Sequence, residues 1–588
     1  MSVRGWLFLS AACASLAACA SGGGGGGGGT GGSSGGGGGG SPPPTVNSSL
    51  SNLVYSQDFT NTAATQTASI DLSGGAVNSD SVSGTTLTVH YDAAAKSYTV
   101  NAPGRSQTFT PADLQASTAD EGTMYAKTAG GNSDHLTLFA NPASAGTSYV
   151  GLGFWQRNQI SGTTQNTTFD TFTYGLDTPS ASAPRAGTAA FDTFMVGFLT
   201  NPGDHPKAVS GEGTFSADFK TGLFSADIYP EEDDLITTGS LSGGIELLAG
   251  GHLASSGGGF SGTASFQDGN VTVAGPLDGR FYGPSAQNVG ASFSLDSASG
   301  AAMSGSMIGF QGTTPIAANL SLTDIVTPQL FYTTSAILSI YGNSAGGYTG
   351  AENLFLHGQL DMAANGDFTF GPGSTDLETA TYSQADQVAS SRPNFTSYEK
   401  TVNGLPIQVS VYKSGAANSE LALTYTTFGI WRQDSGTSTQ PKIDEAFFNY
   451  GIVTPDGFLS RRTGSATYRG VVYGDAVDVP QSAKYSISGS SEFDVDFGAK
   501  TFSGNLSLNG LRQDGVSKTF GTFDFSSPRL ANSSTVDLSQ GGVGVGQLLT
   551  LFYGPNAEEI SGDFTVFLSD GSPESGTFIS GATAAKRQ

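Results

Sequence analysis

The stretch TFSADFKTGLFSADI, residues 214–228, has the alternation of a β-hairpin. In its first arm, one face carries Phe215, Ala217 and Phe219, and the other carries Ser216, Asp218 and Lys220, because successive side chains of a strand point to opposite faces. Thr221-Gly222 supplies the turn, and Phe224, Ala226 and Ile228 continue the apolar face on the way back. The stretch therefore predicts two antiparallel strands that are half buried.

Similar alternating segments, separated by turn residues, occur along the whole chain. Short alternating segments end at Gly, Asn, Asp or Pro, and no long amphipathic helix stands out, which favours an all-β fold. Charged residues make up only 12% of the chain, yet the net charge is −25 and the pI is near 4.3. Such a surface repels phosphate backbones and anionic lipid, so nucleic acid is excluded as a partner. The acidity is sufficient to explain solubility, and steering of a basic partner is the alternative.

The chain also repeats itself, and this is its most informative feature. Gly153-Phe154-Trp155 corresponds to Gly429-Ile430-Trp431, and Tyr174-Gly175 corresponds to Tyr450-Gly451, both 276 residues further on. The hairpin motif Phe215-x-x-Asp218-Phe219 recurs as Phe493-x-x-Asp496-Phe497, and Phe281-Tyr282-Gly283-Pro284-x-Ala286 recurs as Phe552-Tyr553-Gly554-Pro555-x-Ala557. We interpret the molecule as a duplicated lobe.

Each lobe divides into two parts. The first part has long irregular strands and ends near the Tyr-Gly pair, and the second begins near Gly187 or Gly464. About eight short strands in roughly 120 residues suit a closed antiparallel barrel, which leaves no sheet edge exposed. We expect the last strand, around Phe578, to close the second barrel as the chain ends.

The N-terminus has the features of an exported lipoprotein. Arg4 precedes a short apolar core, which is too short for a membrane-spanning helix of about 20 residues, and the segment ends in Leu16-Ala17-Ala18-Cys19. Residues 1–18 are predicted to be a lipoprotein signal peptide, with Cys19 as the site of lipid attachment; the alternative is an ordinary signal peptide in which Cys19 is incidental. Residues 19–47 form a tether rich in Gly, Ser and Pro, which behaves as a flexible coil.

These features together resemble the transferrin-binding protein B family of bilobed surface lipoproteins. The resemblance rests on the lipobox, the tether, the repeated hairpins, the two Phe-Tyr-Gly-Pro segments, and the continuation Glu558-Glu559-Ile560-Ser561-Gly562-Asp563-Phe564. It implies two lobes, each with a β-rich handle domain and an eight-stranded antiparallel β-barrel. The expected ranges are 48–184 and 316–460 for the handles, and 185–315 and 461–588 for the barrels.

The resemblance also implies a role. Members of the family capture a host iron carrier and pass it to a TonB-dependent outer-membrane receptor, while relatives bind haem proteins or complement regulators. We therefore expect an outer-membrane, surface-exposed lipoprotein, anchored by a diacylglycerol and an N-acyl chain such as palmitate on Cys19, that binds a protein or an iron or haem carrier. The alternative is an adhesion or host-interaction lipoprotein without a role in transport. The family's ligand contacts lie in variable loops, so no ligand-binding residue is assigned.

Several candidate sites have a structural explanation. Trp155 and Trp431 occupy equivalent places in apolar strands, which indicates core anchors more than ligand-stacking residues, and the same holds for Phe219 and Phe497. No two of the histidines (His90, His135, His205, His252 and His357) have metal-ligand spacing, so no metal site is predicted. The run Glu231-Glu232-Asp233-Asp234 after Pro230 is expected to be a solvated loop.

An enzymatic function is not expected. Gly342-Asn343-Ser344-Ala345-Gly346 matches the nucleophile elbow of hydrolases, but that motif needs a strand-to-helix turn, an acid and a histidine downstream; here the surroundings are all-β and only His357 follows. The two cysteines, Cys13 and Cys19, are used up by cleavage and lipidation, so neither a disulfide nor thiolate chemistry is expected. The chain is predicted to bind rather than catalyse, without a cofactor other than the lipid.

Overall fold

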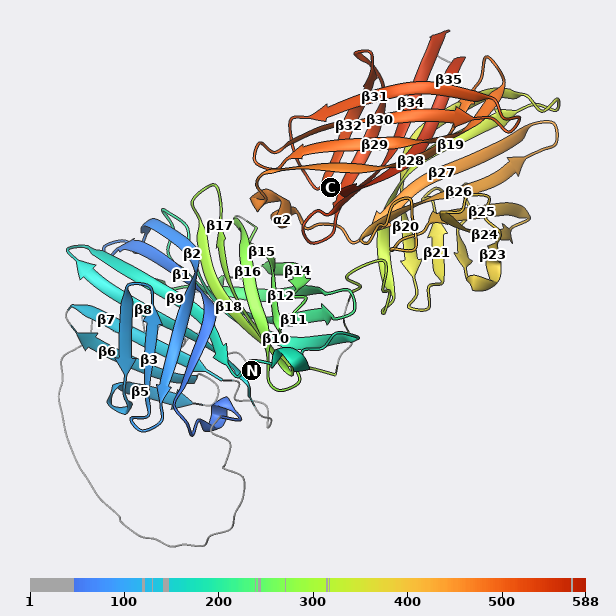
Figure 1. Cartoon of the computed structure of the whole chain (residues 1–588). Helices are drawn as coiled ribbons and strands as arrows, with labels where there is room; N and C mark the ends of the chain where they lie inside the picture. Colours follow the sequence, from blue (N-terminus) through green and yellow to red (C-terminus); the bar gives the residue numbers. More distant parts are fainter. Residues whose placement is uncertain are drawn as a thin grey trace, which may run out of the picture. The chain divides into compact units, whose positions relative to one another are not determined.

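The computed structural model describes residues 47–588, apart from residues 119–121, 130, 141–147, 238–239, 242–244, 270, 314–315, 317 and 573–574. The predicted signal peptide, Cys19 and nearly all of the tether lie outside the described residues. The chain divides into two compact units between Thr313 and Thr314. Each unit holds a nine-stranded antiparallel handle sheet and a closed antiparallel barrel (Figure 1), so the predicted all-β fold with two repeated lobes is confirmed.

The first handle is one sheet with the strand order β4-β3-β2-β1-β9-β8-β7-β6-β5. Its strands are β1 (Gln57–Asp71), β2 (Val77–Asp92), β3 (Ser97–Ala102), β4 (Arg105–Phe109), β5 (Leu114–Thr118), β6 (Gly122–Ala129), β7 (Asn132–Phe139), β8 (Val150–Ser161) and β9 (Thr164–Gly175). Short 3-10 turns flank or interrupt it: η1 (Leu50–Asn52), η2 (Pro111–Asp113) and, before the barrel, η3 (Ser180–Ser182).

The second handle repeats this order as β22-β21-β20-β19-β27-β26-β25-β24-β23. Its strands are β19 (Gln329–Gly342), β20 (Tyr348–Met362), β21 (Phe368–Gly371), β22 (Ala380–Tyr382), β23 (Gln387–Val388), β24 (Phe395–Val402), β25 (Leu405–Tyr412), β26 (Thr426–Gly436) and β27 (Pro441–Gly451), with the turn η4 (Gln384–Asp386) between β22 and β23. Trp155 on β8 and Trp431 on β26 hold the same place in the two sheets.

In each handle sheet, a lysine on the strand next to one edge reaches the strand at the opposite edge. The edge strands β4 and β5 are consecutive in the chain but stand at opposite ends of the strand order. Lys127 on β6 donates a 2.9 Å hydrogen bond to the carbonyl oxygen of Thr108 on β4. In the second handle, Lys400 does the same to Thr381 at 2.7 Å. Both sheets are therefore curled so that their two ends approach each other, and we call each of these contacts a lysine clasp.

The first barrel is closed by eight strands, with the short β13 attached to β12. The strands are β10 (Thr188–Thr200), β11 (Lys207–Asp218), β12 (Leu223–Asp234), β13 (Ser240–Leu241), β14 (Glu246–Leu253), β15 (Gly259–Gln267), β16 (Thr272–Tyr282), β17 (Asn288–Asp296) and β18 (Ala302–Gln311). Its core is filled by phenylalanines: the ring of Phe215 lies 5.2 Å from that of Phe224 and 5.1 Å from that of Phe260.

The predicted hairpin is formed by β11 and β12, and its apolar face is buried. The expectation for the opposite face was wrong for Ser216 and Asp218, which are also buried. The carboxylate of Asp218 accepts hydrogen bonds from the backbone amides of Lys220 and Thr221, at 2.9 and 3.1 Å. Asp218 therefore stabilises the turn instead of facing solvent.

The second barrel is closed by β28 (Ser465–Asp478), β29 (Ala483–Asp496), β30 (Thr501–Leu511), β31 (Ser517–Ser527), β32 (Ser533–Gln540), β33 (Val543–Tyr553), β34 (Glu559–Ser572) and β35 (Ser575–Arg587). A short helix, α2 (Asp456–Arg461), leads into it from the handle. The last strand, β35, pairs with the first, β28, which confirms the predicted closure at the end of the chain.

The repeated Phe-Tyr-Gly-Pro segments join each barrel to its handle. Tyr282 is buried and donates to the side-chain oxygen of Asn61 at 3.1 Å, and Tyr553 is buried and donates to Asn449 at 2.6 Å. The glycine after each tyrosine has a positive φ, +85° at Gly283 and +87° at Gly554, a conformation that favours glycine. The Phe-Tyr-Gly-Pro motif therefore occurs in both lobes because each lobe has the same contact between barrel and handle.

Two other predictions concern single segments. The run from Glu231 to Asp234 was expected to be a loop. This prediction is wrong, because the run forms the end of strand β12 and pairs with β11. In contrast, the Gly342–Gly346 segment is a β-hairpin turn, in which the side chain of Asn343 accepts the amides of Ala345 and Gly347 at 2.9 and 3.0 Å. Its rejection as a nucleophile elbow is confirmed. Within the described residues, none of the helices has the length and hydropathy for a membrane span.

Candidate functional site

The second lobe joins barrel to handle through a buried carboxylate. Glu559, at the start of β34, is fully buried and accepts hydrogen bonds from three consecutive backbone amides before β26 and at its start: Thr424 at 2.7 Å, Tyr425 at 2.8 Å and Thr426 at 3.0 Å. Burial raises the pKa of Glu559, while the three amides act in the opposite direction by favouring the charged form. At the equivalent place in the first lobe, Asn288 accepts the amide of Tyr149, at 3.1 Å, and no other amide among the described residues.

A second buried acid, Asp563, lies four residues further along β34. Asp563 accepts hydrogen bonds from Asn449, at 2.7 Å, and from Thr334, both on the handle. Its other oxygen has no hydrogen-bond partner in the part of the chain that the structure describes. Complete burial raises the pKa of Asp563 well above its usual range, because the low-polarity interior disfavours the charged form.

A charge cluster connects the same two domains. Glu445 on β27 is buried and pairs with Arg432 at 3.0 Å and with Lys484 of the barrel at 2.5 Å. Lys484 lies 3.4 Å from Asp475 as well. Against the lowering effect of burial, Asp475 and Glu445 raise the pKa of Lys484 to about 12. These groups neutralise one another, so the cluster is a structural joint and leaves no charge for a ligand.

The first handle contains a different buried cluster, around Trp155. The indole nitrogen donates to Asp134 at 2.8 Å, and the guanidinium groups of Arg105 and Arg157 lie 4.6 and 5.0 Å from the ring centroid. Arg157 pairs with Asp134 at 2.7 Å, and Arg105 pairs with Asp170 at 2.5 Å. Trp155 is fully buried, as predicted for a core anchor.

Trp431 is also fully buried and confirms the same prediction for the second handle. It packs in one cluster with Ile407, Ala446 and Tyr382, and its indole nitrogen makes no hydrogen bond within the described residues. The two tryptophans therefore share a place but not an environment. Of the two phenylalanines also predicted to be core anchors, Phe497 is buried and Phe219 packs half-buried against the barrel core.

The histidines lie on separate elements. His90 contacts Asp58 at 2.6 Å and His135 contacts Ser133 at 2.9 Å, while His252 and His357 lie on β14 and β20. His205 faces two acceptors, the carboxylate of Asp234 at 2.9 Å and the carbonyl oxygen of Gly74 at 3.0 Å. Its pKa is raised, chiefly by the hydrogen bond to Asp234.

The acidic run contributes to ion pairs and not to a cation site. Glu232 is buried and pairs with Lys207 at 2.6 Å, and Asp234 pairs with His205. Among the described residues, no group of three or more His, Cys, Asp or Glu side chains is placed to hold a metal ion.

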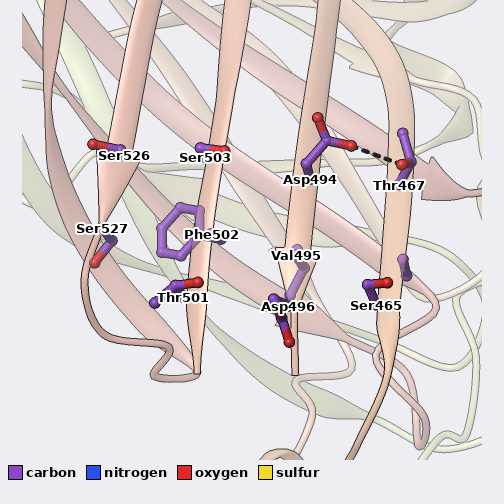
Figure 2. Close-up of a pocket in the computed structure, with 11 residues that line it drawn as sticks. Ser465, Thr467, Asp494, Val495, Asp496, Thr501, Phe502, Ser503, Ser526 and Ser527 are labelled. Atoms are coloured by element: carbon purple, nitrogen blue, oxygen red, sulfur yellow. Dashed lines mark hydrogen bonds between the residues drawn. The ribbon is translucent and has the colours of Figure 1, made fainter. Parts of the chain in front are cut away.

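A polar groove on the second barrel offers space for a ligand. It has a volume of about 560 Å³ and crosses β28, β29, β30 and β31 near one end of the barrel. Figure 2 shows its lining side chains, among them Asp494, which accepts a 2.7 Å hydrogen bond from Thr467. The groove is lined by Ser465, Ala466, Thr467, Asp494, Val495, Asp496, Thr501, Phe502, Ser503, Ser526 and Ser527. Hydroxyls and carboxylates without a cationic side chain suit a neutral or cationic polar ligand.

A smaller crevice of about 360 Å³ lies in the first lobe, between β1 and β2 of the handle and β16 and β17 of the barrel. Thr62, Thr86, Asp278 and Ser292 contribute its polar lining. The sequence did not indicate this crevice or the groove. Both are lined by residues that are distant in sequence and come together only when their strands pair and pack. The alternating Ser, Thr and Asp residues of β28 to β31 were the only signal, and they are equally typical of a solvated strand face.

Comparison with known proteins places the second barrel in a described group. Residues 462–587 match the family model "C-lobe and N-lobe beta barrels of Tf-binding protein B". A search among curated proteins gave no match. The match covers 126 of the 588 residues, all of them in the second barrel or just before it.

The chain is also similar to solved structures of transferrin-binding protein B. A double mutant from Haemophilus parasuis Hp5 shares 16% identity over 75% of this chain and 83% of that chain, with a TM-score of 0.27. The isotype 1 protein from serogroup B Neisseria meningitidis shares 18% over 76% and 86%, with a TM-score of 0.25. Intact Ap-TbpB, with N and C lobes, shares 13% over 90% and 95%, with a TM-score of 0.24.

Proposed function

We propose that this protein is an outer-membrane lipoprotein at the cell surface that captures an iron-carrying host protein of the transferrin class. The chain is transferrin-binding protein B-like, and its second barrel matches that family's barrel model at residues 462–587. The family match is the observation that carries the proposal. The first lobe supports it because it repeats the handle and the closed barrel of the second. We further propose that the captured carrier is handed to a TonB-dependent receptor.

The attachment to the membrane is part of this proposal. Lipid on Cys19 would hold the chain at the outer membrane, and the Gly-rich tether up to residue 47 would let both lobes extend from it. Tethering raises the local concentration of a captured ligand next to a receptor in the same membrane.

The anchor is tested by metabolic labelling with an alkyne analogue of palmitate. The wild-type chain and Cys13→Ala are expected to carry the label, and Cys19→Ala is expected to lose it. Label retained on Cys19→Ala would contradict lipidation at this residue. Protease treatment of intact cells then tests the orientation, because surface-exposed lobes are cleaved without cell lysis, whereas periplasmic lobes are protected.

The ligand is tested with the purified full chain immobilised on a sensor. Iron-loaded transferrin, iron-free transferrin and a haem protein are passed over it, with serum albumin as the control. Specific binding of one iron or haem carrier is expected. If none of them binds at micromolar concentration, and a deletion strain grows normally with transferrin-bound iron as its iron source, the iron-carrier proposal is wrong. An adhesion defect in that strain would then favour a non-transport interaction lipoprotein.

A further inference from the structure

The second barrel has a seam between β31 and β32. Only one residue pair, Asp524–Ser539, is in register between these strands. On their other sides, β31 pairs with β30 along its whole length and β32 pairs with β33 from Ser533 to Gln540. In the first barrel, the corresponding fourth and fifth strands, β14 and β15, pair from Glu246 to Leu253. The seam is therefore specific to the second barrel.

Local backbone geometry explains the seam. Gly521 in β31 has a φ of +99°, and the pairing with β30 shifts register at this point. A residue with this φ interrupts a strand and turns its peptide groups away from the partner. Side chains replace part of the missing backbone pairing: Gln540 donates to the carbonyl oxygen of Phe520 at 2.7 Å, and Ser539 donates to that of Asp524 at 3.2 Å.

Exposed aliphatic side chains surround one end of the seam. Leu511 and Val516 flank the hairpin between β30 and β31, and Val543 follows the hairpin turn between β32 and β33. They are 54%, 49% and 65% exposed. Both hairpins lie at the same end of the barrel, since these strands are antiparallel.

The outer face beside the seam is acidic. Asp524 on β31 and Asp537 on β32 are both exposed, and neither has an ion-pair partner among the described residues. The cations nearest in sequence are Arg529, in the loop between β31 and β32, and Lys518, which is already paired with Asp478 at 2.8 Å. The whole chain carries a net charge of −25, so a basic segment is favoured here over an acidic one.

We propose that this seam binds an extended, basic segment of a partner protein as an added strand. The segment's backbone would pair with the unpaired groups of β31 and β32, the usual source of affinity when a strand is added to a sheet edge. Its alternating aliphatic side chains would face inward, toward the barrel core, and its Lys or Arg side chains would lie beside Asp524 and Asp537. Phe523 and Leu538 are buried in the barrel core beside the seam, so the inserted aliphatic side chains would take over part of their contacts with that core.

The proposal does not depend on the identity of the iron carrier, and it is tested on the full chain with Cys13 and Cys19 replaced by Ser. The probe is an acetylated, amidated peptide of four Lys-Val repeats, and a Glu-Val peptide of the same length is the charge control. Binding is measured by fluorescence anisotropy of the labelled peptides. The Lys-Val peptide is expected to bind at least tenfold more tightly than the Glu-Val peptide. Equal affinity for both peptides would overturn the basic preference.

A disulfide across the seam distinguishes strand addition from binding to an acidic surface. In Asp524→Cys/Ser539→Cys, the reduced and oxidised forms have the same side-chain charges, but only the oxidised form is closed. Oxidation is expected to weaken Lys-Val binding at least tenfold. The matched control is Ser507→Cys/Thr522→Cys on the paired strands β30 and β31, where the two hydroxyls lie 3.3 Å apart; its oxidation should leave the affinity unchanged.

Two results would overturn the proposal. One is unchanged affinity when the seam disulfide forms, with formation confirmed by mass spectrometry. The other is the absence of Lys-Val binding to the unmodified chain at millimolar peptide. Hydrogen exchange gives an independent readout: amides of β31 and β32 should exchange faster than those of β14 and β15 in the free chain, and should become protected when the peptide binds.

Discussion

Replacement of Glu559 by alanine should separate the second barrel from its handle more effectively than any other single truncation at this joint. The carboxylate holds the amides of Thr424, Tyr425 and Thr426 at 2.7 to 3.0 Å, and the last two residues are buried. A hydrogen bond to a charged acceptor contributes about 1.5–3 kcal/mol, and a buried amide left unpaired costs about 1–3 kcal/mol. Since water can reach only part of the opened site, we expect Glu559→Ala to lower the free energy of unfolding of the second lobe by about 4 kcal/mol.

Two variants calibrate this value. Glu559→Gln keeps one oxygen for the amides of Tyr425 and Thr426 but turns an NH₂ group toward Thr424, so it should cost about 1–2 kcal/mol. Asn288→Ala, the equivalent truncation in the first lobe, removes a single neutral acceptor from Tyr149 and should cost about 1 kcal/mol.

The assay is urea unfolding followed by tryptophan fluorescence. Trp155 and Trp431 are the only tryptophans among the described residues, one in each lobe. In a Trp155→Phe background, the signal reports the second lobe, and in a Trp431→Phe background it reports the first. A loss below about 1.5 kcal/mol for Glu559→Ala, or one no larger than that of Asn288→Ala, would refute the argument that three charged-acceptor bonds hold this joint.

Three further predictions concern titratable and aromatic groups. The pKa of His205 is raised in the folded protein. Its contribution to first-lobe stability is therefore complete below pH 6.5 and is lost as the pH rises through the higher folded-state pKa, which lowers the melting temperature. His205→Gln should abolish this decline, and an unchanged decline would show that another group causes it. Burial raises the pKa of Asp563 well above its usual range, so its charged form destabilises the folded lobe at neutral pH. Asp563→Asn should therefore raise the melting temperature at pH 8 and leave it nearly unchanged at pH 4. Equal shifts in melting temperature at the two pH values would contradict this. Trp155→Phe loses the hydrogen bond to Asp134, whereas Trp431→Phe loses no hydrogen bond. In unfolding followed by circular dichroism, Trp155→Phe should lower the free energy of unfolding by about 1.5–3 kcal/mol more than Trp431→Phe. Equal losses of free energy would mean that the hydrogen bond contributes nothing.

Local periodicity was sufficient to predict the strands and the barrels. Phe215 and Phe224 alternate with small and polar residues, and the same alternation returns in the second lobe. A duplicated pattern gives two observations of each element, so the closed barrels could be predicted without any contact information. The burial of Trp155 and Trp431 was predictable for the same reason.

The errors arose where a side chain meets a partner that is distant in sequence. Glu232 belongs to a charged run after a proline, which locally favours a loop, but its pairing with Lys207 buries it in a strand. Asp218 was assigned to the polar face, and its role in the turn makes it a buried residue instead.

The sites were less predictable than the fold. Glu559 was part of the segment that carried the family resemblance, yet its function depends on amides more than 130 residues earlier in the chain. The seam between β31 and β32 depends on the conformation of Gly521, one of 85 glycines. Composition alone does not indicate which glycine adopts a positive φ inside a strand.

The lysine clasps have a consequence for how a duplicated protein folds. Two copies of one sheet in a single chain are present at high effective concentration, so the strands of one copy can be taken up by the unfinished edge of the other. Lys127 and Lys400 each bind one edge strand of a sheet to the strand next to its opposite edge, which favours closure of each copy on its own strands. The duplication can thus double the molecule without mixing its halves.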